Sequence, residues 1–160
     1  IMDFKDSIKT CLKEKYASFS GRASRSEFWF FYLFGIAIYG VCILLAVTIS
    51  FKFLWVLGIF ALGVFIPALA VTWRRLHDIN KSGMYFFLPV PFAIIEVILN
   101  SLSSSRGTNE SISILFILVD LGVMLYLLIL YCTDGDKKNN RFGKNIYLKK
   151  KKKRKIKATR

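Results

Sequence analysis

Long apolar runs alternate with short polar segments along the chain. Three runs are long enough to cross a bilayer as helices, since about 20 helical residues span the roughly 30 Å hydrocarbon core: Phe28–Thr48, Phe53–Thr72 and Ile112–Cys132. A fourth run, Met84–Leu99, is shorter and contains Glu96 and two prolines, so we expect a tilted or broken helix there, or one that starts as an interfacial turn. Because a helix satisfies its own backbone hydrogen bonds in lipid, the pattern predicts an all-α integral membrane protein with four transmembrane helices.

A short amphipathic segment precedes the first apolar run. Between Asp3 and Tyr16, apolar side chains recur at helical spacing and four lysines occupy other positions. A basic amphipathic helix of this kind suits the membrane interface, but it suits packing against the protein's own loops equally well, and both interpretations stay open. Ser24 and Glu27 then match a capping box, which predicts that the first membrane helix begins there.

Polar segments divide the chain into parts. The segment from Trp73 to Gly83 separates two predicted membrane hairpins, and the serine-rich stretch Asn100–Asn109 predicts a loop inside the second hairpin. We therefore expect an amphipathic N-terminal helix at 3–20, a four-span membrane domain at 21–145 and a polybasic disordered tail at 146–160, which contains the run Lys149–Lys155.

Basic residues concentrate on one side of the predicted spans. Of the 24 Lys and Arg residues, six precede the first span, three lie in the central polar segment and thirteen follow the fourth span, whereas Lys52 and Arg106 are the only ones in the other two loops. The alternation of four spans puts the three basic segments on one side of the membrane. The positive-inside rule makes that side cytoplasmic, so both termini are expected in the cytoplasm.

The composition argues against most enzymatic and metal-binding functions. The chain is 54% hydrophobic with a net charge of +14, and it holds one histidine and three cysteines without CxxC spacing, which make neither a convincing metal set nor a disulfide framework. Nucleotide-binding, metalloprotease and nucleophile-elbow motifs are missing. The basic tail suits anionic lipid and has too few aromatic residues to stack bases. We therefore expect a non-enzymatic protein without metal or cofactor, for which nucleic acid is an unlikely partner.

The candidate site lies in the central polar segment. If the second membrane helix continues into it, Asp78 meets Arg74 at spacing i,i+4 or Arg75 at i,i+3. The simpler interpretation is a positive anchor with one local ion pair, and it is favoured because one histidine without a partner makes a poor metal or catalytic site. The functional interpretation is a compact site for a phosphate or an anionic lipid head group. The residues expected on this face are Arg22, Arg25, Glu27, Arg74, Arg75, His77, Asp78, Ser82 and Arg141.

Two carboxyl groups fall inside predicted spans. At 1.5 Å per residue, Asp120 lies roughly 12 Å from the start of its span and Glu96 about 6 Å from the end of its own. An ionisable group in a span costs about 2.5–3.5 kcal/mol on insertion scales and is a functional hypothesis by default. Either both line a proton or cation path, or Asp120 is protonated and hydrogen-bonded to a neighbouring span while Glu96 reaches outward. The second interpretation is favoured, because two carboxylates are a thin basis for a pathway.

Three motifs resemble the signature segments of a known family. They are Gly21-Arg22-Ala23-Ser24-Arg25-Ser26-Glu27-Phe28-Trp29, then Arg74-Arg75-Leu76-His77-Asp78 with Ser82-Gly83, then Asn140-Arg141-Phe142-Gly143. In this order they are similar to the "domain of unknown function 805" family over roughly residues 18–145. The resemblance implies a small bacterial inner-membrane protein with four spans and no established biochemical activity. The family often has Trp after the Ser-Gly pair, where Met84 and Tyr85 stand here, and it commonly ends soon after the third motif, so the polybasic extension is a departure.

Two functions from different classes follow from these observations. The leading one is a non-enzymatic inner-membrane protein that binds anionic phospholipid or a membrane-protein partner, including a second copy of itself, through its basic cytoplasmic face. The alternative is a small proton- or cation-coupled transporter or channel component with Asp120 and Glu96 on the path. The first depends on Arg74 and Arg75, whereas the second depends on Asp120.

Overall fold

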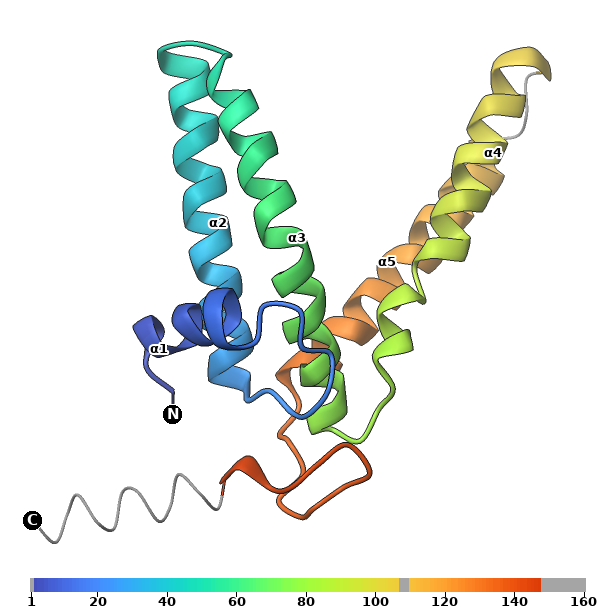
Figure 1. The fold of residues 1–160 in the computed structure, drawn as a ribbon. Helices are drawn as coiled ribbons and strands as arrows, with labels where there is room; N and C mark the ends of the chain where they lie inside the picture. Colours follow the sequence, from blue (N-terminus) through green and yellow to red (C-terminus); the bar gives the residue numbers. More distant parts are fainter. Residues whose placement is uncertain (1, 107–109, 148–160) are drawn as a thin grey trace, which may run out of the picture.

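Two long helical hairpins form a V. The computed structural model describes residues 2–106 and 110–147, and Figure 1 shows α2 (Arg25–Thr48) paired with α3 (Phe53–Asp78) and α4 (Val90–Arg106) paired with α5 (Glu110–Cys132). The hairpins meet where α3 ends and diverge toward the α2–α3 turn. We call the end of the molecule where the hairpins meet the hinge end, and the opposite end, at the α2–α3 turn, the turn end. The fold is therefore the predicted all-α membrane architecture, arranged as two hairpins.

Three helical segments are long and apolar enough to cross a membrane: Arg25–Thr48, Phe53–Asp78 and Ile114–Cys132. The fourth apolar segment begins as the 3-10 helix η2 (Gly83–Phe87), is interrupted at Leu88 and Pro89, and resumes as α4. Proline is tolerated in this first turn of α4 because the backbone N–H groups there have no partner inside the helix. The expectation of a broken helix that begins as a turn is thereby confirmed.

The predicted loop at 100–109 is wrong over most of its length, because α4 continues to Arg106. The extension changes the depth of Glu96, which lies ten residues before the end of α4, as Asp120 lies ten residues after the start of α5. At 1.5 Å per residue both carboxyl groups are about 15 Å from the loop that joins the two helices. Counted from the ends of the observed helices, the sequence-based distances of roughly 12 Å and 6 Å both become about 15 Å.

The first membrane helix begins where the capping motif predicted. Ser24 has extended backbone angles and its hydroxyl accepts a hydrogen bond from the Glu27 N–H at 3.3 Å, so it is the N-cap of α2. The start of α3 at Phe53 also matches the sequence pattern, but α3 passes the predicted end at Thr72 and reaches Asp78. Its 26 residues measure about 39 Å. The last turns therefore project beyond a hydrocarbon core of about 30 Å.

A local backbone motif ends α3. Lys81 N–H donates to the Leu76 carbonyl at 3.0 Å and Asn80 N–H donates to the His77 carbonyl at 3.1 Å, which is the bonding pattern of a Schellman motif. This motif requires a left-handed residue at the first position beyond the cap, and Asn80 supplies it with φ of 59°. The helix thus stops at the hinge, and η2 starts five residues after Asp78, at Gly83, with Ser82 as its N-cap.

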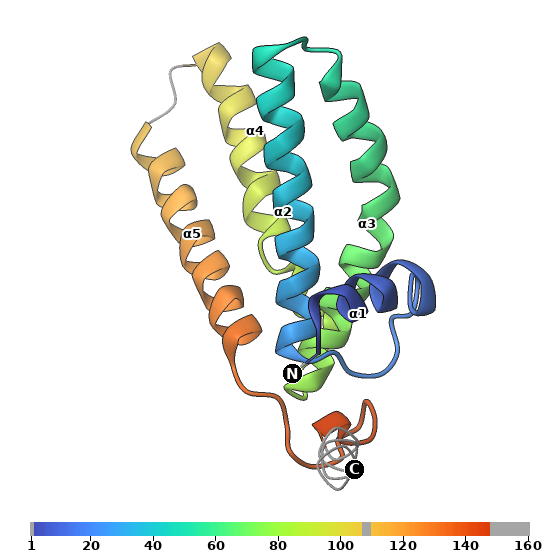
Figure 2. The same cartoon turned by 90° about the vertical axis from the view of Figure 1, so that its left-hand side faces the viewer.

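The N-terminal segment is helical as predicted, with α1 (Phe4–Lys9) continuing into the π-helical turn η1 (Thr10–Glu14). In Figures 1 and 2 it lies across the hinge half of α2. Its inner face, with Ser7, Thr10 and Cys11, is buried, so the segment packs on the protein's own membrane helices. The opposite face exposes lysines, and it remains free for the interface that the alternative interpretation requires.

The far C-terminus falls outside the described residues. Residues 133–147 form an irregular segment beneath the hinge end (Figure 1). The expected polybasic tail at 146–160 overlaps this segment at two residues only, and its Lys149–Lys155 run lies outside the described ranges.

Candidate functional site: a buried ionic cluster at the hinge

Six side chains from distant parts of the chain, five of them buried and one half-buried, form a cluster where the two hairpins meet. They come from the segment before α2, from the first turn of α2, from the end of α3 and from the C-terminal segment. We call them the hinge cluster, and they are Arg22, Glu27, Arg74, Arg75, Asp78 and Tyr147.

Asp78 is the centre of the hinge cluster. Its Oδ1 accepts a hydrogen bond from Arg22 Nε at 2.8 Å, and its Oδ2 accepts one from Arg75 Nη1 at 2.9 Å. The Tyr147 hydroxyl donates to Oδ2 at 2.6 Å. The side chains of Arg22, Arg75 and Asp78 are 0% exposed. The predicted i,i+3 pair between Arg75 and Asp78 is therefore confirmed, and it is one part of a larger network.

Arg74 makes a different pair from the predicted i,i+4 contact. Its Nη1 donates to Glu27 Oε1, and both side chains are buried. The Arg74 carbonyl also accepts from the Ala23 N–H at 2.9 Å. This arginine thus fixes the start of α2 against the end of α3, while its Nε and Nη2 find no acceptor among the described residues.

The thiol of Cys11 lies in the same buried region. Burial, followed by the Glu27 carboxylate, raises the pKa of Cys11 to about 12. Because the thiolate is the reactive form of cysteine, a thiol with this pKa is inert at neutral pH. Cys11 therefore acts as a small core side chain.

Two arginines cap the end of α5. Arg75 donates through Nε to the Tyr131 carbonyl at 3.1 Å and through Nη2 to the Thr133 carbonyl, and Arg25 Nη1 donates to the Cys132 carbonyl at 3.2 Å. The last carbonyls of a helix lack partners inside it, and the helix dipole favours cations at this end. The arginines of the first hairpin thereby hold the second hairpin at the hinge.

The C-terminal segment is tied to the same place. Arg22 donates through Nη1 to the Lys138 carbonyl at 2.8 Å and through Nη2 to the Asp136 carbonyl, and the Asp136 N–H donates to the Asp78 carbonyl at 2.8 Å. Gly135 sits so close that an added Cβ would come within 1.8 Å of Asp78 Oδ2. No side chain fits at position 135 without moving the hinge cluster.

The third sequence motif forms a tight turn over the end of α3. Asn140 and Gly143 exchange backbone hydrogen bonds of 3.1 and 3.2 Å, and the Asn140 side-chain amide donates to the His77 carbonyl at 2.8 Å. The Phe142 ring stacks on the imidazole of His77 at 3.8 Å between centroids. Arg141 is exposed and lies over the Phe142 ring. The only histidine is therefore a packing residue of this turn.

The structure divides the predicted site residues into two groups. Arg22, Glu27, Arg74, Arg75 and Asp78 are brought together and buried, and His77 packs beside them. Arg25 and Arg141 lie at the exposed margin, and Ser82 caps η2. Buried arginines form no accessible surface. Besides the lysines of the N-terminal segment, the exposed cations near the cluster and on the described C-terminal segment are Arg25, Lys137, Lys138, Arg141 and Lys144.

The sequence analysis missed Tyr147 of the hinge cluster and Gly135, which packs against the cluster. Tyr147 and Gly135 lie far from Asp78 in sequence, and their only signals were a single aromatic residue in the polar tail and a glycine between two aspartates. Burial and the hydrogen bond to Asp78 raise the pKa of Tyr147. The phenol consequently stays protonated and remains a hydrogen-bond donor at physiological pH.

The chemistry of the hinge cluster is that of a structural junction. Three arginines face two carboxylates, and their remaining donors go mostly to backbone carbonyls. No group of three or more His, Cys, Asp and Glu within the described ranges could hold a metal ion. The cluster joins the two hairpins and the C-terminal segment through its ion pairs and hydrogen bonds.

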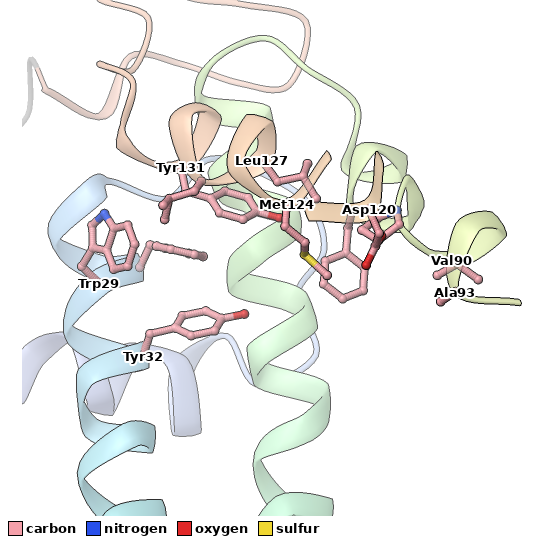
Figure 3. A pocket seen from close by; sticks show the side chains of 12 residues that line it. Trp29, Tyr32, Val90, Ala93, Asp120, Met124, Leu127 and Tyr131 are labelled. Atoms are coloured by element: carbon pink, nitrogen blue, oxygen red, sulfur yellow. The ribbon is translucent and has the colours of Figure 1, made fainter. Parts of the chain in front are cut away.

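The membrane carboxylates lie apart from the hinge cluster. Glu96 and Asp120 are both partly buried. Asp120 Oδ1 is buried and accepts no hydrogen bond from any described residue, and the expected hydrogen bond of a protonated Asp120 to a neighbouring span stays a prediction. Asp120 instead faces a cavity between the hairpins (Figure 3).

The fold and the site define a multi-pass helical membrane protein whose recognisable motifs build one ionic junction. Residues 16–144 match the family described as "Protein of unknown function (DUF805)", and the chain belongs to this family. It is 27% identical over 130 residues to the inner membrane protein YhaI of Escherichia coli (strain K12), covering 81% of this chain and 86% of YhaI. It is 32% identical over 104 residues to the inner membrane protein YhaH of the same strain, covering 61% of this chain and 86% of YhaH. No solved structure matches. The protein is thus a multi-pass inner-membrane member of a family of unknown function.

Proposed function

We propose that this protein is a non-enzymatic, four-span inner-membrane protein with both termini in the cytoplasm, and that its hinge end binds anionic phospholipid. The apolar character of α4 supports the fourth span, and the asymmetry of Lys and Arg supports the orientation. The hinge cluster, in which both carboxylates are paired with buried arginines, argues for a junction in place of a catalytic centre.

The observation that carries the proposal is the exposed basic surface of the C-terminal segment. Between residues 137 and 160 the chain has thirteen Lys and Arg and no Asp or Glu. The hinge cluster anchors the first part of this stretch, where Lys137, Lys138 and Lys144 are exposed. Each basic residue near an anionic membrane surface contributes about 1 kcal/mol to binding. The buried arginines hold the segment in place, and the exposed lysines supply the attraction.

The test is the retention of phosphatidylglycerol by the full chain. The protein is reconstituted into nanodiscs of mixed phosphatidylglycerol and phosphatidylcholine, and native mass spectrometry counts the lipids that stay bound on release. Combining Lys137→Gln, Lys138→Gln and Lys144→Gln is expected to lower the affinity for phosphatidylglycerol by about tenfold or more. The loss falls short of the full sum because salt screens exposed charges.

A matched control removes the same charge elsewhere. Lys5→Gln, Lys9→Gln and Lys13→Gln change three lysines on the exposed face of the N-terminal segment, which the interfacial interpretation also places near lipid, and this triple variant is expected to lose clearly less phosphatidylglycerol than the variant of Lys137, Lys138 and Lys144. Equal loss in both variants would show a non-specific effect of net charge. Loss of a copurifying protein with unchanged lipid would assign the surface to a protein partner. Both outcomes contradict the proposal.

A transporter or channel component is the second candidate. It is favoured by the common depth of Glu96 and Asp120 in the α4–α5 hairpin and by the unpaired Oδ1 of Asp120. Asp120→Asn is expected to abolish a proton- or cation-coupled flux into liposomes. Absence of flux through the unmodified protein would remove this candidate.

A further inference from the structure

A cavity of about 530 Å³ lies between the two hairpins, on the hinge side of the V. Figure 3 shows it bounded by side chains of α2, α4 and α5. This volume lies within the range of small-molecule sites, roughly 300–1,000 Å³. The cavity is separate from the hinge cluster, since none of the six cluster residues lines it.

The wall of the cavity is mostly apolar, and its polar side-chain atoms belong to Trp29, Tyr32, Asp120 and Tyr131. Asp120 is the only ionisable carboxyl group on it, and the Oδ1 of Asp120 is buried and unpaired among the described residues. The Tyr32 hydroxyl is already engaged with Thr72 Oγ1 at 2.8 Å. No Lys or Arg of the described residues lines the cavity. A carboxylate in an apolar site needs a proton or a cation, and the described lining offers no cation.

Aromatic rings form the other end of the cavity. Trp29, Tyr32 and Tyr131 lie away from Asp120 in Figure 3, with Met124 between them. Aromatic faces favour organic cations and apolar rings. A hydrated metal cation is a poor occupant, because Ca²⁺ and Mg²⁺ require six or more oxygen ligands and the wall offers one carboxylate.

From this arrangement we propose that the cavity binds a protonated amine with an apolar, ring-containing body. Its ammonium group donates a hydrogen bond to Asp120 Oδ1 and neutralises the carboxylate. Its body extends past Met124 to the rings of Trp29, Tyr32 and Tyr131. Such a ligand partitions into the bilayer and reaches the cavity from there.

The test uses two probes of the same shape and different charge, 4-phenylbutylamine and 4-phenylbutan-1-ol. Their affinities for the full chain in nanodiscs are measured by equilibrium dialysis at neutral pH, against empty nanodiscs that correct for partitioning. The amine is expected to bind the unmodified protein about tenfold or more tightly than the alcohol, because only the amine cancels the buried charge. If the unmodified protein bound the two probes with equal affinity, that result alone would overturn the proposal.

Two variants locate the site. Asp120→Asn is expected to reduce amine binding about tenfold or more and to leave alcohol binding nearly unchanged. Glu96→Gln removes a carboxyl group at the same depth that does not line the cavity, and it is expected to keep amine binding. Unchanged amine affinity in Asp120→Asn would overturn the proposal, and so would an equal loss in Glu96→Gln.

Discussion

Asp78 shows at the scale of one residue how the hinge depends on charge. Its carboxylate lies between the guanidinium groups of Arg22 and Arg75 with all three side chains 0% exposed. A buried ion pair contributes modest net stability, but removing one partner leaves an uncompensated charge and costs about 3–5 kcal/mol. Removing the Asp78 carboxylate leaves the charges of Arg22 and Arg75 buried without this partner.

We therefore expect Asp78→Asn to destabilise the protein by about 3–5 kcal/mol. The matched control is Asp134→Asn, because Asp134 pairs with Arg25 at 2.5 Å but its side chain is 73% exposed, and exposed pairs contribute about 1 kcal/mol or less. The measurement is the free energy of unfolding in one detergent for both variants. Similar small losses would show that the hinge cluster is not buried in solution.

Tyr147 adds a pH-dependent contribution to the same carboxylate. Burial, followed by the hydrogen bond to Asp78, raises the pKa of Tyr147 above its ordinary value of 10.0. The folded state therefore keeps a proton that the unfolded chain releases as the pH passes 10.0. Stability from this residue is fully present below that pH and is lost as the pH rises above it.

This linkage predicts a difference between the unmodified protein and Tyr147→Phe. The melting temperature of the unmodified protein is expected to fall more steeply above pH 10.0 than that of the variant, which has no phenol to ionise at this position. Thermal unfolding followed at neutral and alkaline pH provides the measurement. Parallel curves for the two proteins would exclude a buried Tyr147 hydroxyl.

At the scale of the elements, one backbone carbonyl of α3 has no helical partner, and the N-terminal segment supplies a donor for it. Pro67 has no N–H to donate to the Gly63 carbonyl, its partner at i−4. The Tyr16 hydroxyl, just beyond η1, donates to that carbonyl at 2.7 Å. An unpaired carbonyl is costly in an apolar surrounding, so this contact fastens the N-terminal segment to a defined point of α3.

Tyr16→Phe is consequently expected to destabilise the packing of the N-terminal segment by about 0.5–1.5 kcal/mol, the net value of a typical hydrogen bond. In the Pro67→Ala background the same substitution should cost less, because the backbone N–H restored at position 67 pairs with the Gly63 carbonyl. Hydrogen exchange of residues 4–14 reports the opening of this segment. If Tyr16→Phe cost the same free energy in both backgrounds, the contribution of the Tyr16 hydrogen bond would not depend on the missing N–H of Pro67.

The extension of α4 has a similar local reason. The serine-rich stretch after Leu99 predicts a loop because serine favours turns. In the structure the Ser101 hydroxyl donates to the Val97 carbonyl at 2.8 Å, one turn back. This bond satisfies the hydroxyl inside a helix, so Ser101 is compatible with the continuation of α4 beyond its apolar run.

At the scale of the whole molecule, the hinge end and the turn end differ in charge. Lys52 lies in the α2–α3 turn, whereas Lys144 lies in the segment held by the hinge cluster. If the hinge end is cytoplasmic, as the positive-inside rule requires, these two positions lie on opposite sides of the membrane.

Single cysteines test this orientation. In a variant whose three native cysteines are replaced by serine, Lys144→Cys is expected to react with a membrane-impermeant maleimide only after the cells are opened. Lys52→Cys is expected to react in cells whose outer membrane alone is permeable. The opposite pattern would reverse the topology and contradict the proposed cytoplasmic lipid surface.

The sequence by itself determined the helical elements and their place in a membrane. Continuous apolar runs have few alternatives to helices in lipid, and the Ser24 cap acts through neighbouring residues, so α2, α3 and α5 followed from local pattern. Three motifs in the expected order were also enough to identify the family.

Only the tertiary structure decided what the motif residues do. Arg74 and Arg75 are adjacent and of one type, yet Arg74 pairs with Glu27 and Arg75 with Asp78 and the end of α5. Their partners lie 47 to 58 residues away except Asp78, and no periodicity encodes such distances. From the sequence alone, adjacent basic residues are expected to be exposed to solvent. The meeting of the two hairpins buries its arginines, because helix ends and carboxylates from elsewhere in the chain supply the compensating negative charge.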